Sequence, residues 1–124
     1  MPKILHFDDD TFMTGMYKLK FESLVYDYIT FEHPPQDLVA MVKREKPDLI
    51  IMDIVMPEMD GYRATELLKT DPATRDIPIC GLSNMGQQQD VNKALSLGMA
   101  EYWVAAEYAP DDIIAMVKKR ISNK

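Results

Sequence analysis

Two groups of aspartates are the residues of this chain best suited to chemistry. Three consecutive aspartates occupy positions 8–10, directly after the apolar residues 4–7, and Asp53 follows the apolar run 49–52. Clustered carboxylates repel one another and lose hydration, so they persist mainly where a cation or a reaction requires them. A Met-Pro turn and an Asp-Gly pair at 60–61 come soon after Asp53. We therefore interpret Asp53 as the centre of a site.

Five short apolar segments must position these aspartates. We predict strands at residues 4–7, 26–31, 48–52, 77–82 and 102–104. The segment 48–52 is apolar on both faces, which is typical of a parallel sheet covered by helices on its two sides. Such sheets bind ligands at the carboxyl ends of their strands. We expect four groups to meet at that edge: the aspartates at 8–10, Asp53, Ser83 and Ala105.

Amphipathic segments alternate with the strands and are predicted to be helices. The first has Thr11 as its cap, the second is opened by the prolines at 34–35, and the third covers residues 62–69. The fourth ends at Gly98 and the fifth starts at Pro110. Five strands alternating with five helices predict an α/β fold.

Length and composition exclude several classes of protein. The 124 residues, 47% of them hydrophobic, suffice for one domain, to which we assign residues 1–124. A net charge of -6 argues against direct nucleic-acid binding, because phosphate neutralisation needs a basic face. No apolar run approaches the roughly 20 residues that span a bilayer. The single cysteine, Cys80, excludes an internal disulfide and fits a reducing cytoplasm.

The chain resembles the receiver domain of bacterial two-component response regulators. The likeness rests on the acidic cluster at 8–10, the segment 53–61 (Asp-Ile-Val-Met-Pro-Glu-Met-Asp-Gly), Ser83 thirty residues after Asp53, and Gly98 followed by Tyr102. It covers almost the whole chain. It implies a flavodoxin-like (βα)5 three-layer sandwich, with a five-stranded parallel sheet in the order 2-1-3-4-5.

The resemblance implies a role for each site residue. Asp53 would accept a phosphoryl group, and Asp9 would bind Mg²⁺, or Mn²⁺ in its place, with Asp8 acting through water. The backbone carbonyl of Val55 would be a further ligand. Phosphoryl transfer depends mainly on positioning and charge neutralisation, which these groups supply.

The resemblance also implies switching residues and partners. Ser83 resembles the hydroxyl that turns toward the phosphorylated aspartate, and Tyr102 the aromatic that follows it inward. The implied donor is a sensor histidine kinase or a histidine phosphotransfer protein, and the implied target is a protein. Such a domain is not an enzyme acting on other substrates. Homodimerisation through residues 91–95, 102–104 and the last helix is left open.

One position departs from the family pattern. The family normally has Lys-Pro after the fifth strand, whereas this chain has Ala105-Ala106, and its next Lys is Lys118. The missing ammonium would have bridged the acceptor carboxylate and a phosphate oxygen. A hydrogen bond to a charged group is worth about 1.5–3 kcal/mol. We therefore expect weaker coupling between phosphorylation and shape change, with Mg²⁺ binding retained.

Three interpretations of Ala105 compete. It is an engineered substitution, a natural variant that still accepts phosphate weakly, or the mark of a pseudo-receiver that signals without phosphate. The retained acidic cluster, acceptor and hydroxyl weigh against the third interpretation. A structural interaction module remains the main rival, and absence of saturable Mg²⁺ binding would favour it.

Other classes and other residues have weaker support. An Asp-x-Asp phosphohydrolase would need Thr at position 12, where this chain has Phe12, and a nucleotide- or flavin-binding loop would not hold three aspartates, which repel phosphate.

His6 is expected to be a packed core residue. Asp10 either starts a helix or belongs to the site. Met85 would make the rim of the site apolar and slow the loss of phosphate, and Trp103 serves either the core or an interface.

Overall fold

Strands and helices alternate along the chain, as the apolar segments predict. The computed structural model describes residues 1–123, and only Lys124, the end of the assigned domain, lies outside them. The elements are β1 (Lys3–Phe7), α1 (Thr11–Ser23), β2 (Asp27–Phe31), α2 (Leu38–Glu45), β3 (Leu49–Met52), α3 (Gly61–Thr70), β4 (Ile79–Ser83), α4 (Gln88–Ser96), β5 (Glu101–Val104), the 3₁₀ turn η1 (Ala105–Glu107) and α5 (Pro110–Ser122).

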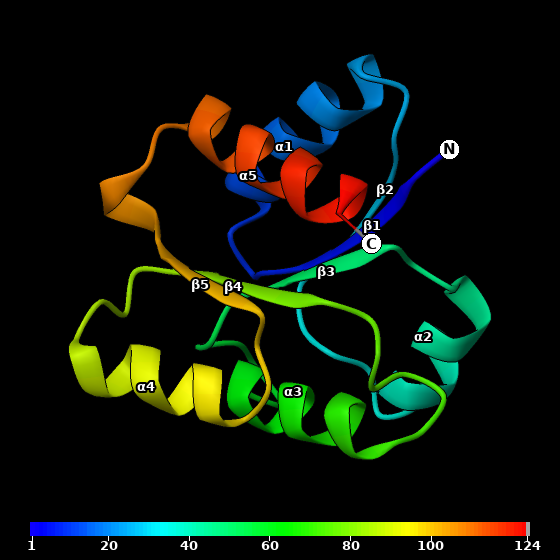
Figure 1. The fold of residues 1–124 in the computed structure, drawn as a ribbon, viewed down its shortest axis with the longest axis vertical. Coiled ribbons are helices and arrows are strands. Elements are labelled where there is room, and N and C mark those ends of the chain that lie inside the picture. Colours follow the sequence, from blue (N-terminus) through cyan, green and yellow to red (C-terminus); the bar gives the residue numbers. More distant parts are fainter. Residues whose placement is uncertain (124) are drawn as a thin grey trace.

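The five strands form one parallel sheet in the order β2-β1-β3-β4-β5. Helices α1 and α5 cover one face, and α2, α3 and α4 cover the other (Figure 1). The predicted three-layer flavodoxin-like fold and its strand order are therefore confirmed. Because all strands run the same way, their carboxyl ends share one edge of the sheet.

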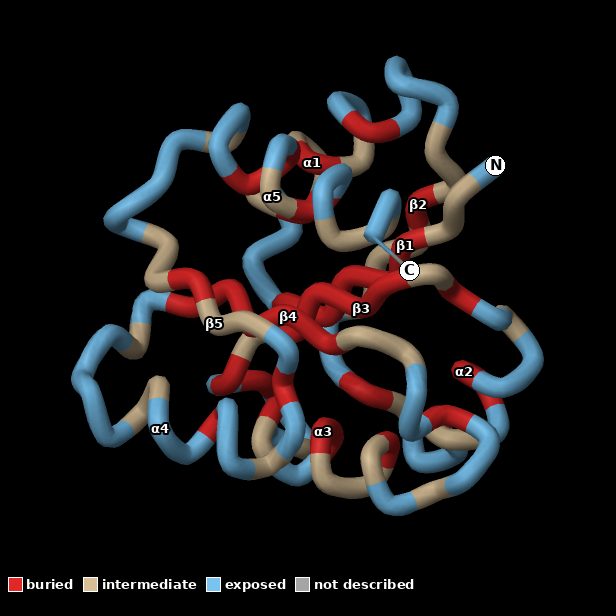
Figure 2. The backbone as a smooth tube through the Cα atoms, viewed as in Figure 1, coloured by how far each residue is buried: buried red, intermediate tan, exposed pale blue. Residues whose placement is uncertain are grey.

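The core consists of two apolar clusters, one on each face of the sheet. Alternate residues of β1 and β3 contribute to opposite clusters: Leu5 and Ile50 pack toward α2, α3 and α4, whereas Ile4 and Ile51 pack toward α1 and α5. Every residue of β3 is buried. Buried backbone is concentrated in the central strands, and the outer sides of the helices are exposed (Figure 2).

Several predicted boundaries differ from the structure by one residue, and three predictions at the ends of elements were wrong in ways that matter for the site or the fold. The side chain that caps α1 is that of Asp10, which accepts a hydrogen bond from the N–H of Met13, and not that of Thr11. Helix α2 begins at Leu38 and not at the prolines 34–35, because Asp37 is the residue that precedes its first turn. Strand β4 starts at Ile79 and includes Ser83.

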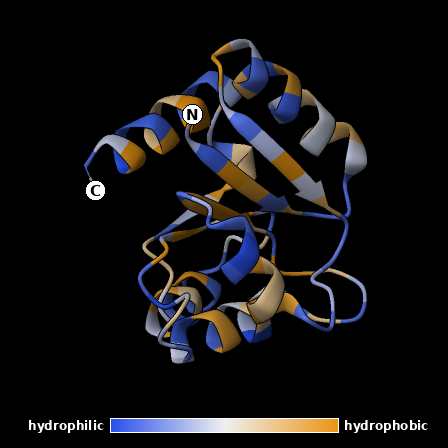
Figure 3. Ribbon diagram, turned by 90° about the vertical axis from the view of Figure 1, so that its right-hand side faces the viewer, coloured by the Kyte–Doolittle hydropathy of each residue, from blue (hydrophilic) through white to orange (hydrophobic). Residues whose placement is uncertain are grey.

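The helices carry both hydrophilic and hydrophobic residues (Figure 3), as expected where one side faces a core and the other faces water. Among residues 1–123, no helix combines the length and the hydropathy needed to cross a bilayer.

Candidate functional site

Carboxylates from two strands meet at the carboxyl edge of the sheet. Asp8 and Asp9 follow β1 and Asp53 follows β3, and one oxygen from each of the three lies within 4.8 Å of the others. The predicted convergence of these strand ends is thus found in the structure.

Main-chain hydrogen bonds set the positions of these aspartates. The N–H of Asp8 donates to the carbonyl of Phe31 at 2.9 Å, and the N–H of Asp53 donates to the carbonyl of Phe7 at 2.9 Å. The ladder between strands therefore continues one residue beyond β1 and β3. Each carboxylate is also held locally. Asp8 Oδ1 accepts from the N–H of Asp10 at 2.8 Å, and Asp53 Oδ1 accepts from the N–H of Ile54 at 2.7 Å.

The loop from β3 to α3 closes against the acceptor residue. The N–H of Gly61 donates to the carbonyl of Ile54 at 2.8 Å, and the carboxylate of Asp60 caps α3 by accepting from the N–H of Arg63 at 2.8 Å. A Cβ at position 61 would collide with the backbone carbonyl of Asp53. Only glycine allows this close approach, which explains the Asp-Gly pair noted in the sequence.

A hollow of about 150 Å³ opens over the three carboxylates. Among the described residues its lining includes no Lys or Arg, and Ala105 forms part of its wall. Asp10 also lines the hollow, so it both caps α1 and belongs to the site. Sequence reasoning missed Met13 and Asn84, which line it as well. Asn84 could have been found from its place directly after Ser83, whereas nothing in the sequence distinguishes Met13 from core methionines.

Burial and mutual repulsion make the site electrostatically costly without a cation. Burial raises the pKa of Asp8 from 3.8 to about 7; the Asp10 N–H opposes this shift, and the charges of Asp53, Asp10 and Asp9 add to it. Burial also raises the pKa of Asp53, against hydrogen bonds from the Ile54 N–H and the Ser83 hydroxyl. A divalent cation would remove this repulsion.

Three carboxylate oxygens are a donor set that fits Mg²⁺. This ion prefers oxygen ligands and usually keeps several waters, so two or three protein oxygens suffice. Asp8, Asp9 and Asp53 would hold it. Val55 lies in the loop after Asp53 with a 65% exposed side chain, and its carbonyl as a further ligand stays a prediction.

Ser83 and Tyr102 are linked through Met85. The Ser83 Oγ, buried beside Asp53, accepts from the N–H of Met85 at 3.2 Å, and the Tyr102 hydroxyl donates to the carbonyl of Met85 at 2.6 Å. A Cβ on Gly81 would meet the Tyr102 ring, so this glycine makes room for the ring beside β4. The loop after β4 is therefore tied to both residues that the resemblance assigns to switching.

Two other predicted residues lie in the core. His6 is fully buried, its Nδ1 lies 2.7 Å from the Tyr28 hydroxyl, and burial lowers its pKa from 6.5 to about 3. The expectation of a packed core histidine is confirmed. Trp103 is 2% exposed and packs with the α1 and α5 cluster, while its Nε1 donates to Glu101 at 3.2 Å. Of the two roles open for Trp103, the structure supports the core.

The strand order and the aspartate cluster at the carboxyl edge agree with one class of signalling domain, the response regulator receiver. The family model of the response regulator receiver domain matches residues 4–118, and the chain belongs to this family.

Relatives and solved structures agree with this assignment. RpaA of Synechocystis, a DNA-binding transcriptional regulator, is 29% identical over 95% of this chain and 48% of its own length. PilH of Pseudomonas aeruginosa is 38% identical over 73% of this chain and 74% of PilH.

Among solved structures, a putative response regulator from Chloroflexus aurantiacus has the same fold, with a TM-score of 0.86 at 23% identity, over 98% of this chain and 99% of that one. The receiver domain of a sensor histidine kinase from P. aeruginosa has a TM-score of 0.84 at 26% identity, over 98% of both chains, and holds a magnesium ion in its active-site cleft. The chain spans about half the length of the first curated relatives, 48% of RpaA and 49% of PhoB of P. aeruginosa.

Proposed function

We propose that this receiver accepts a phosphoryl group on Asp53, in a Mg²⁺-dependent reaction, from a phosphohistidine of a sensor kinase or a histidine phosphotransfer protein. The proposal rests on one observation. At the carboxyl edge of the sheet, one carboxylate oxygen from each of Asp8, Asp9 and Asp53 lies within 4.8 Å of the others. Such a set is costly unless a cation neutralises it.

The chemistry follows from the positions of these side chains. A carboxylate oxygen of Asp53 attacks phosphorus while the bond from phosphorus to the histidine nitrogen breaks. The other ring nitrogen of the phosphohistidine carries a proton, so the products are an acyl phosphate on Asp53 and a neutral histidine. Asp53 must be ionised for this attack, and the hydrogen bond from the Ile54 N–H fixes one of its oxygens, Oδ1, at 2.7 Å. Bound Mg²⁺ would supply positive charge that offsets repulsion between Asp53 and the phosphate.

Ala105 limits what phosphorylation achieves. Among residues 1–123 no Lys or Arg lines the hollow, so the bridging ammonium that the family normally supplies is missing from its wall. We expect transfer to Asp53 to survive, because the carboxylates and the metal site remain. The movement of Ser83 and Tyr102 toward the phosphate is weakened instead. Signalling then proceeds through contacts with a downstream protein and not through catalysis on another substrate.

Intact mass spectrometry tests the proposal. Treatment with a small acyl phosphate and Mg²⁺ should add one phosphoryl mass, and Asp53→Asn should abolish the addition. Ala105→Lys should label at least as fully. If the native chain gains no mass while Ala105→Lys does, then Ala105 has abolished the acceptor function.

A pseudo-receiver that works without phosphate is the second candidate. Within residues 1–123 no cationic side chain belongs to the lining of the hollow, which favours this candidate. Isothermal titration with Mg²⁺ separates the two: saturable binding lost in Asp9→Asn supports the phosphoacceptor, and no saturable binding supports a purely structural interaction module.

A further inference from the structure

Asn84 brings a hydrogen-bond donor to the hollow over Asp53. It follows β4 directly and lines the hollow together with Ser83 and Ala105. Within residues 1–123 its side-chain amide has no hydrogen-bond partner, whereas the hydroxyl of Ser83 already bonds to Asp53. The amide nitrogen of Asn84 is therefore available to an anion held beside Asp53.

Asn84 lies next to the position at which the family lysine is missing. Ser83 pairs with Val104 across the parallel strands β4 and β5. Asn84 and Ala105 are the next residues along the two chains, and both line the hollow. A Cβ on Gly86 would lie 2.9 Å from Cγ1 of Val104, so the loop after β4 packs against the end of β5. Because neighbouring strands are only about 4.8 Å apart, the amide of Asn84 can reach the space that an ammonium at position 105 would fill.

The main chain on both sides of Asn84 is held in place. Ser83 is buried at the end of β4, and its Oγ accepts from the N–H of Met85 at 3.2 Å. The carbonyl of Met85 accepts from the hydroxyl of Tyr102 at 2.6 Å. With the backbone anchored in this way, two side-chain torsions orient the amide of Asn84, so ordering it against a ligand costs little entropy.

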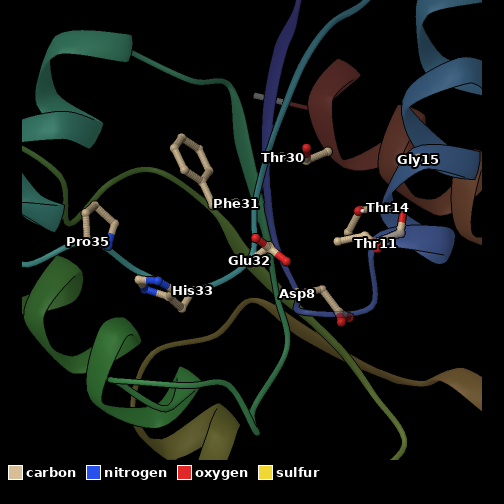
Figure 4. Close-up of a pocket in the computed structure, with 9 residues that line it drawn as sticks. All are labelled: Asp8, Thr11, Thr14, Gly15, Thr30, Phe31, Glu32, His33 and Pro35. Atoms are coloured by element: carbon tan, nitrogen blue, oxygen red, sulfur yellow. Dashed lines mark hydrogen bonds between the residues drawn. The ribbon is translucent and has the colours of Figure 1, made fainter.

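Basic side chains from α1 and from the β2–α2 segment do not supply such a donor. In α1, Lys18 donates to a main-chain carbonyl of β2 at 2.6 Å, and Lys20 pairs with Asp111 at 3.8 Å. Beside β2, Asp8 also lines a larger cavity, of about 580 Å³, whose lining holds no Lys or Arg of the described chain. Figure 4 shows His33 across the connecting segment from Asp8. The donor that remains at the hollow is the amide of Asn84.

We propose that the side-chain amide of Asn84 donates a hydrogen bond to a phosphoryl oxygen on Asp53, in place of the ammonium missing at position 105. Asn84 acts on the group that the proposed function places on Asp53, so its role rests on that function. An amide is neutral and, unlike an ammonium, does not compete with Mg²⁺ for the carboxylates. Asn84 therefore stabilises the phosphorylated state without weakening the metal site.

Titration with beryllofluoride, a mimic of the bound phosphoryl group, tests the proposal at saturating Mg²⁺, with amide NMR shifts as the readout. Asn84→Ala should weaken beryllofluoride binding about tenfold, the value of one hydrogen bond to a charged group. Asn84→Asp keeps the shape of the side chain, replaces the donor by a carboxylate, and should weaken binding further. The matched control is Gln89→Ala, which removes an exposed amide of α4 and should leave the affinity unchanged.

Ala105→Lys separates replacement of the ammonium from an independent contact. If the amide of Asn84 serves in its place, Asn84→Ala should cost less than about threefold once the lysine holds the same oxygens. A titration with Mg²⁺ alone gives a second readout. Asn84→Ala should change the Mg²⁺ affinity less than about twofold, because Asn84 is not a ligand of the metal.

Three results would overturn the role of Asn84 and leave the phosphoacceptor standing. They are equal beryllofluoride affinity of the native chain and Asn84→Ala, an equal cost of Asn84→Ala with Ala105 and with Lys at that position, and an equal loss of Mg²⁺ affinity. The last would show that Asn84 only maintains the loop. Binding of beryllofluoride by Ala105→Lys and not by the native chain would also overturn it. Failure of both chains to bind the mimic would refute the proposed function as well.

Discussion

At the scale of single residues, the site is governed by the cost of bringing carboxylates together. Asp8 bears much of that cost, because burial and three neighbouring aspartates raise its pKa to about 7. At neutral pH the metal-free protein therefore holds Asp8 partly protonated. A metal ion must displace that proton, so Mg²⁺ affinity should increase as the pH rises through about 7.

Asp8→Asn tests this cost in the metal-free protein. Folding raises the pKa of Asp8 from 3.8 to about 7, so its contribution to stability is full below 3.8 and is lost as the pH rises through 7. The variant should gain stability relative to the native chain over that interval, by about 1–2 kcal/mol after allowance for solvent at the hollow. Urea unfolding at several pH values measures the difference, and parallel profiles would contradict the prediction.

Met85→Glu tests the apolar rim. The main chain of Met85 bonds to Ser83 and Tyr102, whereas its side chain packs against the α2–α3–α4 cluster and is not among the described residues that line the hollow, so its place at the rim stays a prediction. A carboxylate there would orient water toward the acyl phosphate, so we expect the phosphate to be lost several-fold faster than from the native chain. The decay of the phosphorylated mass after removal of the donor gives the rate. An unchanged decay would show that position 85 does not control water access.

At the scale of elements, the loop between β3 and α3 has the most direct effect on the site, because it closes against the main chain of Asp53. The loop between β3 and α3 folds back so that Gly61 lies against the main chain of Asp53. Gly15, in the interior of α1, has open space around it. These two glycines therefore make a matched pair, because the same added methyl group meets opposite surroundings.

Gly61→Ala should destabilise the domain, and Gly15→Ala should stabilise it. The first substitution forces the loop away from Asp53 and should cost about 1–3 kcal/mol, with loss of Mg²⁺ affinity. The second removes the glycine penalty in a helix and should add about 0.5–1 kcal/mol. Chemical denaturation of both variants checks the signs. Equal effects would mean that the close contact at Asp53 is not constraining.

The sequence predicted the strands, the helices and the shared carboxyl edge of the sheet better than it predicted the helix caps and the residues that line the hollow. Apolar runs ending on aspartate identified β1 and β3, because buried parallel strands need apolar side chains on both faces. The cap of α1 was misassigned, since both Asp10 and Thr11 can cap a helix and only the backbone path decides between them. The place of Met13 in the wall of the hollow depends on how α1 packs against segments distant in sequence, which no local pattern encodes.

At the scale of the whole molecule, two buried groups oppose each other in acid. Protonating Asp8 relieves repulsion, whereas protonating His6 places a charge in the core. Between about pH 4 and 7 their effects on the free energy of unfolding have opposite signs. The native chain should therefore show a flatter pH profile than either single variant.

His6→Gln isolates the second effect. Folding lowers the pKa of His6 from 6.5 to about 3, so the stability it supports is present above 6.5 and is lost as the pH falls toward 3. From pH 7 to pH 4 the native chain should lose on the order of 3 kcal/mol relative to the variant. Thermal unfolding across this range tests it. If the native chain and the variant lose the same free energy of unfolding, His6 accepts a proton in the folded protein as readily as in the unfolded chain.

The main-chain bonds from Asp8 and Asp53 to the carbonyls of Phe31 and Phe7 have one more consequence. They fix the spacing between the two carboxylates through the sheet itself and not through the surrounding connections. Those connections can change in length or composition while the anchoring points stay where they are. The same sheet can in this way acquire new binding specificities while the positions of Asp8 and Asp53 stay the same.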